Sequence, residues 1–402
     1  MPREIALKAR TILLGIALAA TLPRCTTAPP RRSGVARKAV PPGENPFLHA
    51  VGSKLVDGRG NPVLLRGICF GNDVWSNPPR PPVNHHTEAD FRSLRALGMN
   101  AVRFYLNDAL FEDEARPFVY KASGLEWLDQ NFAWARSSGI YLVLNLHVPP
   151  GGYQSNGRGA ALWKLPQDRE RFLDLWRELA RRYRDEPALA GYDLLNEPVV
   201  AGDPGEWEEL ARESLAAIRE EDRRHAIFVE RLNAVVTPGG SLDWTEDRNG
   251  RMNFFLLEDG NIVYEFHFYK PMAFTHQGAS YVPGLRSVRT SYPGPFRDGD
   301  GRQRIADREY LEEQLAPYLA FGREHDVPLY MGEFGVIREG FDAGRNGEGW
   351  VADVIDLAQA AGVSFTYHAF HERLFGLYRD DATRPPADLN RALADVFARK
   401  LR

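Results

Sequence analysis

Cysteine is nearly absent from this chain, since only two occur among its 402 residues. Cys25 lies near the end of a leader-like N-terminal segment, which leaves Cys69 unpaired within an apolar stretch. So few cysteines exclude a disulfide framework. Cys69 could be a reactive nucleophile, but a free cysteine is usually a small buried hydrophobic side chain, and we expect that role here.

A long apolar run is also lacking. The run from Ile12 to Leu22 follows three basic residues and is too short to span a bilayer, a pattern typical of a signal peptide. We therefore predict a signal peptide over residues 1–24 and secretion to the periplasm or the extracellular space. The alternatives are an uncleaved N-terminal anchor and lipid attachment at Cys25, which the bulky, charged Arg24 before it disfavours.

Basic residues are outnumbered by acidic ones outside the first 40 residues. The formal net charge is −4, and residues 1–40 hold eight basic residues but one acid, so residues 41–402 carry a net charge of −11. An acidic body argues against nucleic acid as a partner.

Large apolar residues are rare from Thr26 to Pro46, where Pro, Arg, Gly and Ser dominate. This composition predicts a flexible linker, which we place at residues 25–46. A second such linker and an internal repeat are both lacking further along the chain. We therefore expect one domain over residues 47–402, in a monomeric protein.

Short β-branched or aromatic runs alternate in this domain with amphipathic stretches of helical length, the pattern of parallel strands joined by helical crossovers. After a hairpin that turns at residues 58–61, eight strands are predicted, at 64–70, 101–106, 141–147, 191–196, 226–230, 262–267, 328–333 and 363–367. Eight such repeats favour a (β/α)8 TIM barrel, in which the chemistry takes place at the carboxyl ends of the strands.

The competing fold is a doubly wound open sheet. It usually has a glycine-rich phosphate-binding turn after its first strand, and residues 67–71 do not supply one. Helix signals lie between the strands: Thr87 with Asp90 resembles a capping box, and Gly98 closes the same helix. Apolar residues at helical spacing predict two further helices, around residues 172–183 and 311–319.

Polar side chains fall at or near the ends of the predicted strands. A charged group that ends an apolar strand must meet solvent or a partner, and several that converge at one barrel mouth can satisfy one another around a ligand. The residues in question are Arg103, His147, Asn196 with Glu197, His267 with Tyr269, and Glu333.

Two of them, Glu197 and Glu333, follow the fourth and seventh strands and would face each other across the mouth. Cleavage of a glycosidic bond needs such a pair, because one carboxyl protonates the leaving oxygen while the other supports the developing oxocarbenium ion. In a retaining enzyme the two lie roughly 5 Å apart, and their repulsion keeps one protonated and the other ionised. Either glutamate alone would more often be a surface salt-bridge partner.

The motifs around both glutamates, LLNEP at 194–198 and YMGEFG at 330–335, closely resemble the signatures of glycoside hydrolase family 5, the cellulase family of retaining barrel glycosidases. The resemblance extends through GMNAVR at 98–103, NLH at 145–147 and EFHFY at 265–269. These motifs occur in the family's order and span most of the predicted barrel.

The resemblance implies that Glu197 is the acid/base and Glu333 the nucleophile. It also implies that Asn196 binds the sugar hydroxyl next to the reacting carbon. Tyr269 would hydrogen-bond the nucleophile, and Arg103 would keep it ionised, as a buried carboxylate requires.

His147 and His267 would line the subsite that holds the departing bond, with His267 placed to tune the acid and His147 to contact a sugar hydroxyl. The two could instead be structural histidines, or could bind a metal together with the glutamates. No close histidine pair at ligand spacing exists, and His85-His86 falls in a predicted loop. We therefore expect neither a metal nor another cofactor.

The eighth strand departs from the family, which commonly has a tryptophan there as the floor for the reacting sugar. His368 is the aligned residue, and Tyr367 and Phe370 are the other candidates for a stacking surface. Loop aromatics could add platforms, since sugar rings present apolar C–H faces, although any one of them is about as often packed as sugar-binding. The candidates are Trp75, Tyr153, Trp163, Trp244 and Tyr281.

We therefore expect a secreted endo-acting β-glycanase whose partner is a polysaccharide or oligosaccharide. β-1,4-Glucan is the first substrate to consider, because the resemblance is to cellulases; related members act on β-mannan, mixed-linkage glucan, exopolysaccharides or glycolipid head groups. One rival is a non-catalytic carbohydrate-binding barrel, although loss of turnover would be expected to remove Glu197 or Glu333 first. A second rival is a transglycosylase, which only product analysis distinguishes from a hydrolase.

Overall fold

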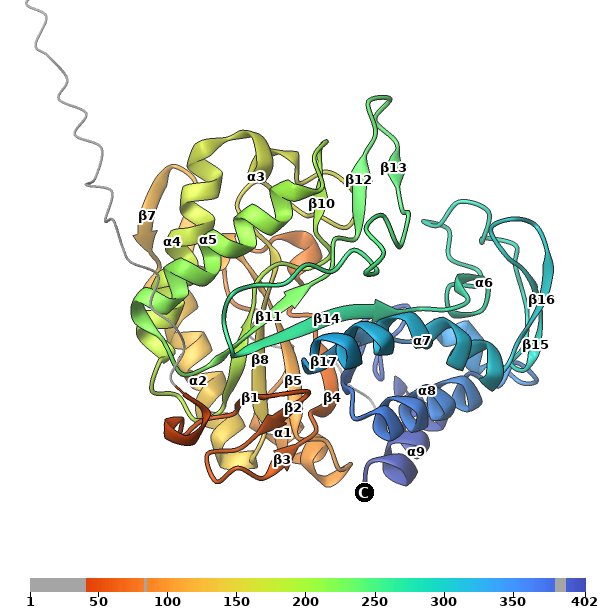
Figure 1. Ribbon diagram of the computed structural model, residues 1–402. Coiled ribbons are helices and arrows are strands. Elements are labelled where there is room, and N and C mark those ends of the chain that lie inside the picture. The colour runs from red at the N-terminus through yellow and green to blue at the C-terminus, as the bar shows by residue number, and fades with distance from the viewer. Residues whose placement is uncertain (1–40, 83–84, 380–387) are drawn as a thin grey trace, which may run out of the picture. The chain divides into compact units, whose positions relative to one another are not determined.

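The computed structural model describes residues 41–82, 85–379 and 388–402 (Figure 1). The predicted signal peptide, most of the predicted linker and Cys25 lie outside the described residues. The described chain begins with η1 (Pro42–Glu44) and an antiparallel sheet of β1 (His49–Val51), β2 (Lys54–Val56) and β3 (Pro62–Val63). The turn predicted at residues 58–61 joins β2 to β3, and the Asp57 carboxylate closes it by accepting hydrogen bonds from the amides of Arg59 and Asn61 at 2.9 Å.

Parallel strands then close into an eight-stranded barrel, which confirms the predicted (β/α)8 fold. In order around the barrel they are β4 (Arg66–Phe70), β5 (Ala101–Asn107), β8 (Tyr141–Val148), β9 (Leu189–Asp193), β11 (Ala226–Glu230), β14 (Ile262–Phe268), β17 (Leu329–Phe334) and β18 (Ser364–Tyr367), which pairs with β4. The prediction that the fourth strand reaches Asn196 is wrong. β9 ends at Asp193 because the chain turns there, and Glu197 adopts a left-handed backbone with φ of 44°.

Helices lie around these strands (Figure 1). They are α1 (Glu88–Ala96), α2 (Ala122–Ser138), α3 (Ala160–Lys164), α4 (Pro166–Tyr183), α5 (Gly205–Glu221), α6 (Met272–Thr275), α7 (Arg308–His325), α8 (Gly347–Ala361) and α9 (Arg391–Lys400). Single 3-10 turns occur at η2 (Val74–Ser76), η3 (Asp108–Leu110) and η4 (Arg338–Phe341). In the described part of the chain, no helix is both long enough and apolar enough to cross a membrane.

Short additional strands lie in the loops that follow the carboxyl ends of the barrel strands. They are the hairpin of β6 (Glu112–Asp113) and β7 (Arg116–Tyr120), the small sheet of β10 (Val199–Val200), β12 (Ala234–Val236) and β13 (Leu242–Asp243), and the hairpin of β15 (Gly294–Arg297) and β16 (Gln303–Ala306). β12 with β13 and β15 with β16 stand out from the barrel in Figure 1.

The helix ends follow the predicted signals. The Thr87 amide donates to the Asp90 carboxylate at 2.7 Å, which forms the capping box of α1. Gly98 follows this helix with φ of +94°, a conformation that glycine adopts without steric cost. Asp307 caps α7 by accepting from the amide of Tyr310 at 2.9 Å.

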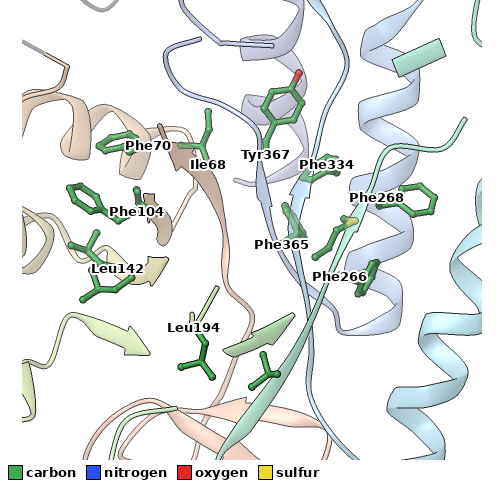
Figure 2. Packing of buried hydrophobic residues seen from close by; sticks show 14 of the residues in the cluster. Ile68, Phe70, Phe104, Leu142, Leu194, Phe266, Phe268, Phe334, Phe365 and Tyr367 are labelled. Carbon is green, nitrogen blue, oxygen red and sulfur yellow. The ribbon is translucent and has the colours of Figure 1, made fainter. Parts of the chain in front are cut away.

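Two layers of buried hydrophobic side chains stabilise the barrel. The outer layer packs the strands against the helices, and Figure 2 shows part of it, including Ile68, Phe104 and Phe266. The inner layer, which we call the barrel floor, combines residues of the N-terminal sheet with inward-facing strand residues. Its members are Leu48, Leu55, Leu65, Ala101, Val143, Ala190, Ala226, Phe228, Val263 and Tyr330. The N-terminal sheet therefore closes the amino end of the barrel, which leaves the carboxyl ends for polar groups.

Ile68 and Ile305 provide a matched test of the outer layer. Ile68 on β4 is fully buried, whereas Ile305 on β16 is 50% exposed. Ile68→Ala should lower the free energy of unfolding by about 2–5 kcal/mol, because it removes buried methyl groups and leaves a cavity. Ile305→Ala should change it by about 0.5 kcal/mol or less. Urea denaturation of both variants measures the difference, and equal losses would contradict this packing.

Candidate active site

The alternation of side chains along the strands carries polar residues into the barrel above its floor. Ala101 on β5 belongs to the floor, so Arg103 and Tyr105, two and four residues later, lie on the same inner side. The same period of two applies to β8, β11 and β14. The polar residues reached in this way are Arg103, Tyr105, Asn145, His147, Glu230, Glu265 and His267.

Glu333 on β17 is fixed by three donors. Its Oε1 accepts from Arg103 Nη1 at 2.8 Å and from the Tyr105 hydroxyl at 2.6 Å, while its Oε2 accepts from the Tyr269 hydroxyl at 2.8 Å. Burial favours a raised pKa for this carboxyl, but the positive charges around it, His267 foremost, hold the pKa of Glu333 well below its usual value. Glu333 is therefore ionised at neutral pH, with both oxygens oriented.

Arg103 lies at the centre of the network, with its side chain fully buried. Its Nε donates to Asp193 at 2.7 Å, and its Nη2 lies 2.9 Å from Glu265 Oε1. Its Nη1 donates hydrogen bonds to Glu333 Oε1 at 2.8 Å and to Asn196 Oδ1 at 3.1 Å. A planar guanidinium has five donors in a fixed fork, so one side chain can orient groups from several strands.

Three acidic side chains, those of Asp193, Glu265 and Glu333, share the single guanidinium of Arg103. Burial raises the pKa of Asp193 above its ordinary value, and the neighbouring Glu265 raises it further, although Arg103 acts in the opposite direction. Glu265 approaches closely because residue 332 is glycine: a Cβ there would lie 1.7 Å from Glu265 Oε1. The glycine of the YMGEFG motif thus makes room for the Arg103–Glu265 pair.

Glu197 lies in a different environment. Its amide donates to Glu230 Oε2 at 2.6 Å, which anchors the turn after β9. Its Oε1 lies 3.0 Å from His267 Nδ1. The Glu197 side chain is 22% exposed, whereas that of Glu333 is 8% exposed. One carboxylate oxygen of Glu197 and one of Glu333 lie within 4.8 Å of each other. Two carboxyls in unlike surroundings are therefore close neighbours.

His267 on β14 links the two carboxyls. Its Nε2 lies 3.6 Å from Glu230 and 3.5 Å from Glu265, while its Nδ1 lies 3.7 Å from Glu333 Oε2. Burial favours a lowered pKa for this imidazole, but the charges of Glu230 and Glu333 outweigh that effect and place the pKa of His267 well above its usual value. His267 therefore carries a proton on both nitrogens at neutral pH.

His147 and Trp75 belong to the same cluster. The His147 ring stacks on Tyr105 with centroids 4.0 Å apart, and its Nδ1 lies 3.0 Å from Asn145 Oδ1. Burial lowers the pKa of His147 well below its usual value, so the ring is neutral at neutral pH. The Trp75 indole stands edge-on to His147 at 6.0 Å and is 43% exposed. The structure thus brings together every strand-end residue singled out from the sequence, and Trp75 with them.

The other aromatic candidates are placed differently. The expectation that Trp163 lies in a loop is wrong: it lies in α3, where its Nε1 donates to Gln154 Oε1 at 3.0 Å and its ring packs against the hydrophobic core. Tyr153 stacks against His147 at 5.7 Å. Trp244 and Tyr281 are exposed. A sugar-binding role for each of these residues stays a prediction.

Cys69 is free and fully buried on β4, with its Sγ 3.5 Å from the carbonyl oxygen of Gly332. Burial and the nearby Glu333 charge raise the pKa of this thiol to about 12. Because the thiolate is the nucleophilic form, Cys69 is inert at neutral pH, in agreement with its expected role as a small buried side chain.

Two groups of side chains in the described residues have the spacing for a metal ion: Glu197 with His267 and Glu333, and Glu230 with Glu265 and His267. Both groups use His267, whose raised pKa opposes metal binding because a ligand imidazole must lose its proton. Arg103 already lies beside two of these carboxylates, which leaves less negative charge for an ion.

Sequence reasoning missed Tyr105, Asp193 and Glu230, and gave Glu265 no role of its own. Tyr105 lies two residues after Arg103 in the same strand, so the period of two could have placed it beside Arg103. Glu230 ends a strand that was predicted with that boundary, the same signal that singled out the other residues. Asp193 ends β9 in the structure but fell inside the predicted fourth strand, so this signal could not have found it.

Comparison with known proteins agrees with this geometry. Residues 56–373 match the family model described as "Cellulase (glycosyl hydrolase family 5)". "Endoglucanase C" of Acetivibrio thermocellus is 28% identical over 333 residues, which cover 78% of this chain and 91% of that protein. "Beta-xylosidase" of Phanerodontia chrysosporium is 31% identical over 223 residues, which cover 46% of each chain. The solved structure of Thermotoga maritima Cel5A with cellobiose has a TM-score of 0.65 at 24% identity, covering 83% of this chain and 97% of that one, and shows the shared fold.

Arg103 should be essential for stability as well as for the geometry. Arg103→Leu removes the guanidinium that pairs with the buried Asp193, Glu265 and Glu333, so the free energy of unfolding should fall by about 3–5 kcal/mol at pH 7. Arg181, whose pair with Glu178 is on the surface, is the control, and Arg181→Leu should cost about 1 kcal/mol or less. Urea denaturation at pH 7 compares the two, and a small loss in Arg103→Leu would contradict the network described here.

Proposed function

The chain belongs to glycosyl hydrolase family 5, the cellulase family, and from that membership we propose that it is a secreted, retaining, endo-acting β-glycanase. Glu333 is the proposed nucleophile and Glu197 the proposed acid/base. The observation that carries this proposal is the approach of their carboxylate oxygens to within 4.8 Å. Retaining glycosidases place the two carboxyls about 5 Å apart, whereas inverting enzymes leave a wider gap for water.

In the first step, a Glu333 oxygen attacks the anomeric carbon while Glu197 gives its proton to the departing glycosidic oxygen. The bond to the leaving sugar breaks and a glycosyl ester forms on Glu333. In the second step, Glu197, now a carboxylate, takes a proton from a water molecule whose oxygen attacks the same carbon and releases Glu333. The two inversions together retain the β configuration.

The surroundings of Glu333 suit a nucleophile. Donors from Arg103, Tyr105 and Tyr269 keep both oxygens in fixed positions, so little reorganisation is needed when the anomeric carbon approaches. The hydrogen bonds from these donors weaken as negative charge leaves the carboxylate during attack. The low pKa of Glu333 also makes the ester a good leaving group in the second step.

The surroundings of Glu197 suit a group that must both lose and regain a proton. Its side chain is the more exposed of the two carboxyls and bonds to His267, whose Nε2 in turn lies near Glu230 and Glu265. Asn196, one residue earlier, has its Oδ1 fixed by Arg103 and its Nδ2 bonded to Ser155 Oγ at 3.2 Å. That amide is the proposed partner of the sugar hydroxyl next to the reacting carbon.

β-1,4-Glucan is the first proposed substrate, supported by the relative named "Endoglucanase C", of which the match covers 91%. β-Mannan, xylan, exopolysaccharides and glycolipid head groups are the alternatives, since the residues that carry the mechanism do not select among them. Secretion is proposed from the N-terminal sequence, with its apolar run from Ile12 to Leu22.

The proposal is tested by the release of reducing sugar from β-glucans, β-mannan, xylan and glycolipids. The wild type should act on one of them, and Glu333→Ala and Glu197→Ala should each lower turnover of that substrate at least about 1,000-fold. Glu309→Ala, an exposed glutamate on α7, is the matched control and should retain full activity. Turnover that survives in Glu333→Ala, or tight sugar binding without turnover, would favour a binding protein or another mechanism. Products longer than the substrate would indicate a transglycosylase.

Added azide separates the two roles in the same variants. In Glu333→Ala, azide takes the place of the missing carboxylate and should give an α-glycosyl azide. In Glu197→Ala with an aryl glycoside, whose leaving group needs no proton, azide attacks the glycosyl ester and should give the β anomer. The opposite assignment of anomers would show that the roles are exchanged.

The acid limb of the pH profile reports the ionisation of Glu333. Because the pKa of Glu333 is depressed, the nucleophile should stay ionised to pH values below 4.5 in the wild type. Tyr269→Phe removes a donor to the ionised form, so the acid limb of kcat/KM should move upward by about one pH unit. Tyr120→Phe, which removes a hydroxyl bonded to Asp174 on the barrel's outer side, should leave the profile unchanged. An unshifted limb in Tyr269→Phe would exclude this contact as a determinant of the nucleophile's pKa.

A further inference from the structure

The structure distinguishes the three candidates at the end of the eighth strand. Tyr367 is fully buried, its ring packs against Phe334 and Phe397, and its hydroxyl bonds the main chain of Val336. Phe370 is buried against Phe70. Of the three, only His368 contacts the cluster around Glu333.

That contact runs through Tyr105. The His368 Nδ1 lies 3.1 Å from the Tyr105 hydroxyl oxygen, which lies 2.6 Å from Glu333 Oε1. An ionised carboxylate can only accept, so the tyrosine hydrogen points to Glu333. The hydroxyl oxygen is then an acceptor toward His368, and the hydrogen between them belongs to Nδ1. The contact therefore fixes a proton on His368 Nδ1 in the neutral and the charged ring alike.

We propose that His368 is a positioning residue that orients the Tyr105 hydroxyl toward Glu333, and that its Nε2 edge meets a hydroxyl of the reacting sugar in place of a flat stacking surface. This inference rests on the proposed function, because it takes Glu333 as the nucleophile. In the neutral ring Nδ1 holds the proton, so Nε2 is a hydrogen-bond acceptor. A sugar hydroxyl supplies the complementary donor.

The rings around His368 support a fixed orientation. His368 lies parallel to Tyr105, with centroids 6.1 Å apart and an interplanar angle of 15°. Trp75 stands edge-on to His368 at 6.0 Å and to Tyr105 at 6.3 Å. The Phe375 ring lies tilted against His368, with centroids 5.5 Å apart. The imidazole is thus confined between aromatic rings, with Trp75 as the exposed apolar surface beside it.

The titratable groups that face or surround His368 come from five elements: Cys69 on β4, Tyr105 on β5, His147 on β8, Glu333 on β17, and His276 in the segment after α6. Burial lowers the pKa of His276 to about 4, so this neighbour is neutral at neutral pH.

Side-chain replacements can separate the two roles. His368→Asn places an amide nitrogen near the position of Nδ1 and removes the Nε2 edge. His368→Phe keeps a ring and removes both nitrogens. His368→Phe should raise the acid limb of kcat/KM by about half a pH unit or more and lower kcat about 10-fold, because Tyr105 loses its partner. His368→Asn should keep the acid limb near that of the wild type while KM rises, because the sugar loses its acceptor.

A double-mutant cycle tests whether His368 acts through Tyr105. In a Tyr105→Phe background the hydroxyl is gone, so adding His368→Phe should produce no further shift of the acid limb. The same shift in both backgrounds would overturn the proposal, as would an unshifted limb in a folded His368→Phe. If His368→Phe fails to fold, His368→Asn and His368→Ala carry the comparison, and equal acid limbs in these two would also overturn it.

The outcomes separate this inference from the proposed function. If wild-type enzyme has no turnover on any glycan, or Glu333→Ala keeps its turnover, the proposed function fails. If Glu333→Ala is inactive while the cycle is additive, the proposed function stands and the role of His368 fails. Assays on an activated aryl glycoside and on the polymer give the acid limb and KM in the same preparations.

Discussion

The buried guanidinium of Arg103 is the interaction on which the rest of the site depends. Moving a carboxylate out of water costs several kcal/mol. Three acidic side chains that contact Arg103, those of Asp193, Glu265 and Glu333, are buried together at this barrel mouth. A lysine would supply the charge at a single point, whereas the planar fork of arginine reaches residues of β9, β14 and β17 together. The barrel makes this possible because neighbouring parallel strands bring their inner side chains to a common level, above a floor closed by the N-terminal sheet. Arg103 also contributes to the orientation of both Glu333 and Asn196, since its Nη1 donates to each of them.

The two central glutamates differ because their partners differ. Glu333 meets an arginine and two tyrosine hydroxyls, all donors that favour its ionised form. Glu197 meets His267 with its side chain and Glu230 with its amide, in a turn with a left-handed backbone. His267 stands between them and keeps its charge because acidic groups surround it. The proposed nucleophile must stay ionised and the proposed acid/base must change state, and this division of partners suits both proposed roles.

Much of this site could be predicted because strand periodicity and short motifs are local properties. The eight strands, the capping box at Thr87 and the positions of His267 and Glu333 near the ends of their strands all follow from residues close in sequence. Arg103 instead lies within β5, where the alternation of side chains carries it into the barrel. The end of β9 could not be predicted, since it depends on a contact with a distant segment, the bond from the Glu197 amide to Glu230. The contact of His368 with Tyr105 could not be predicted either, because it depends on the relative position of β5 and the end of β18. The sequence pattern of a strand predicts which of its residues face inward. The hydrogen-bond partner of each inward-facing residue depends on how neighbouring strands are placed.

If Glu333 is the nucleophile, it forms a covalent bond to the sugar, and that bond can be trapped. A 2-deoxy-2-fluoro β-glycoside of the cleaved sugar with a good leaving group lets the first step proceed and slows the second, because fluorine destabilises both oxocarbenium-like transition states. Digestion and mass spectrometry of the inactivated enzyme should show the added sugar on the peptide at Glu333, and no label in Glu333→Ala. A label on Glu197 or elsewhere, or turnover with inversion and no trapped ester, would show that Glu333 is not the nucleophile.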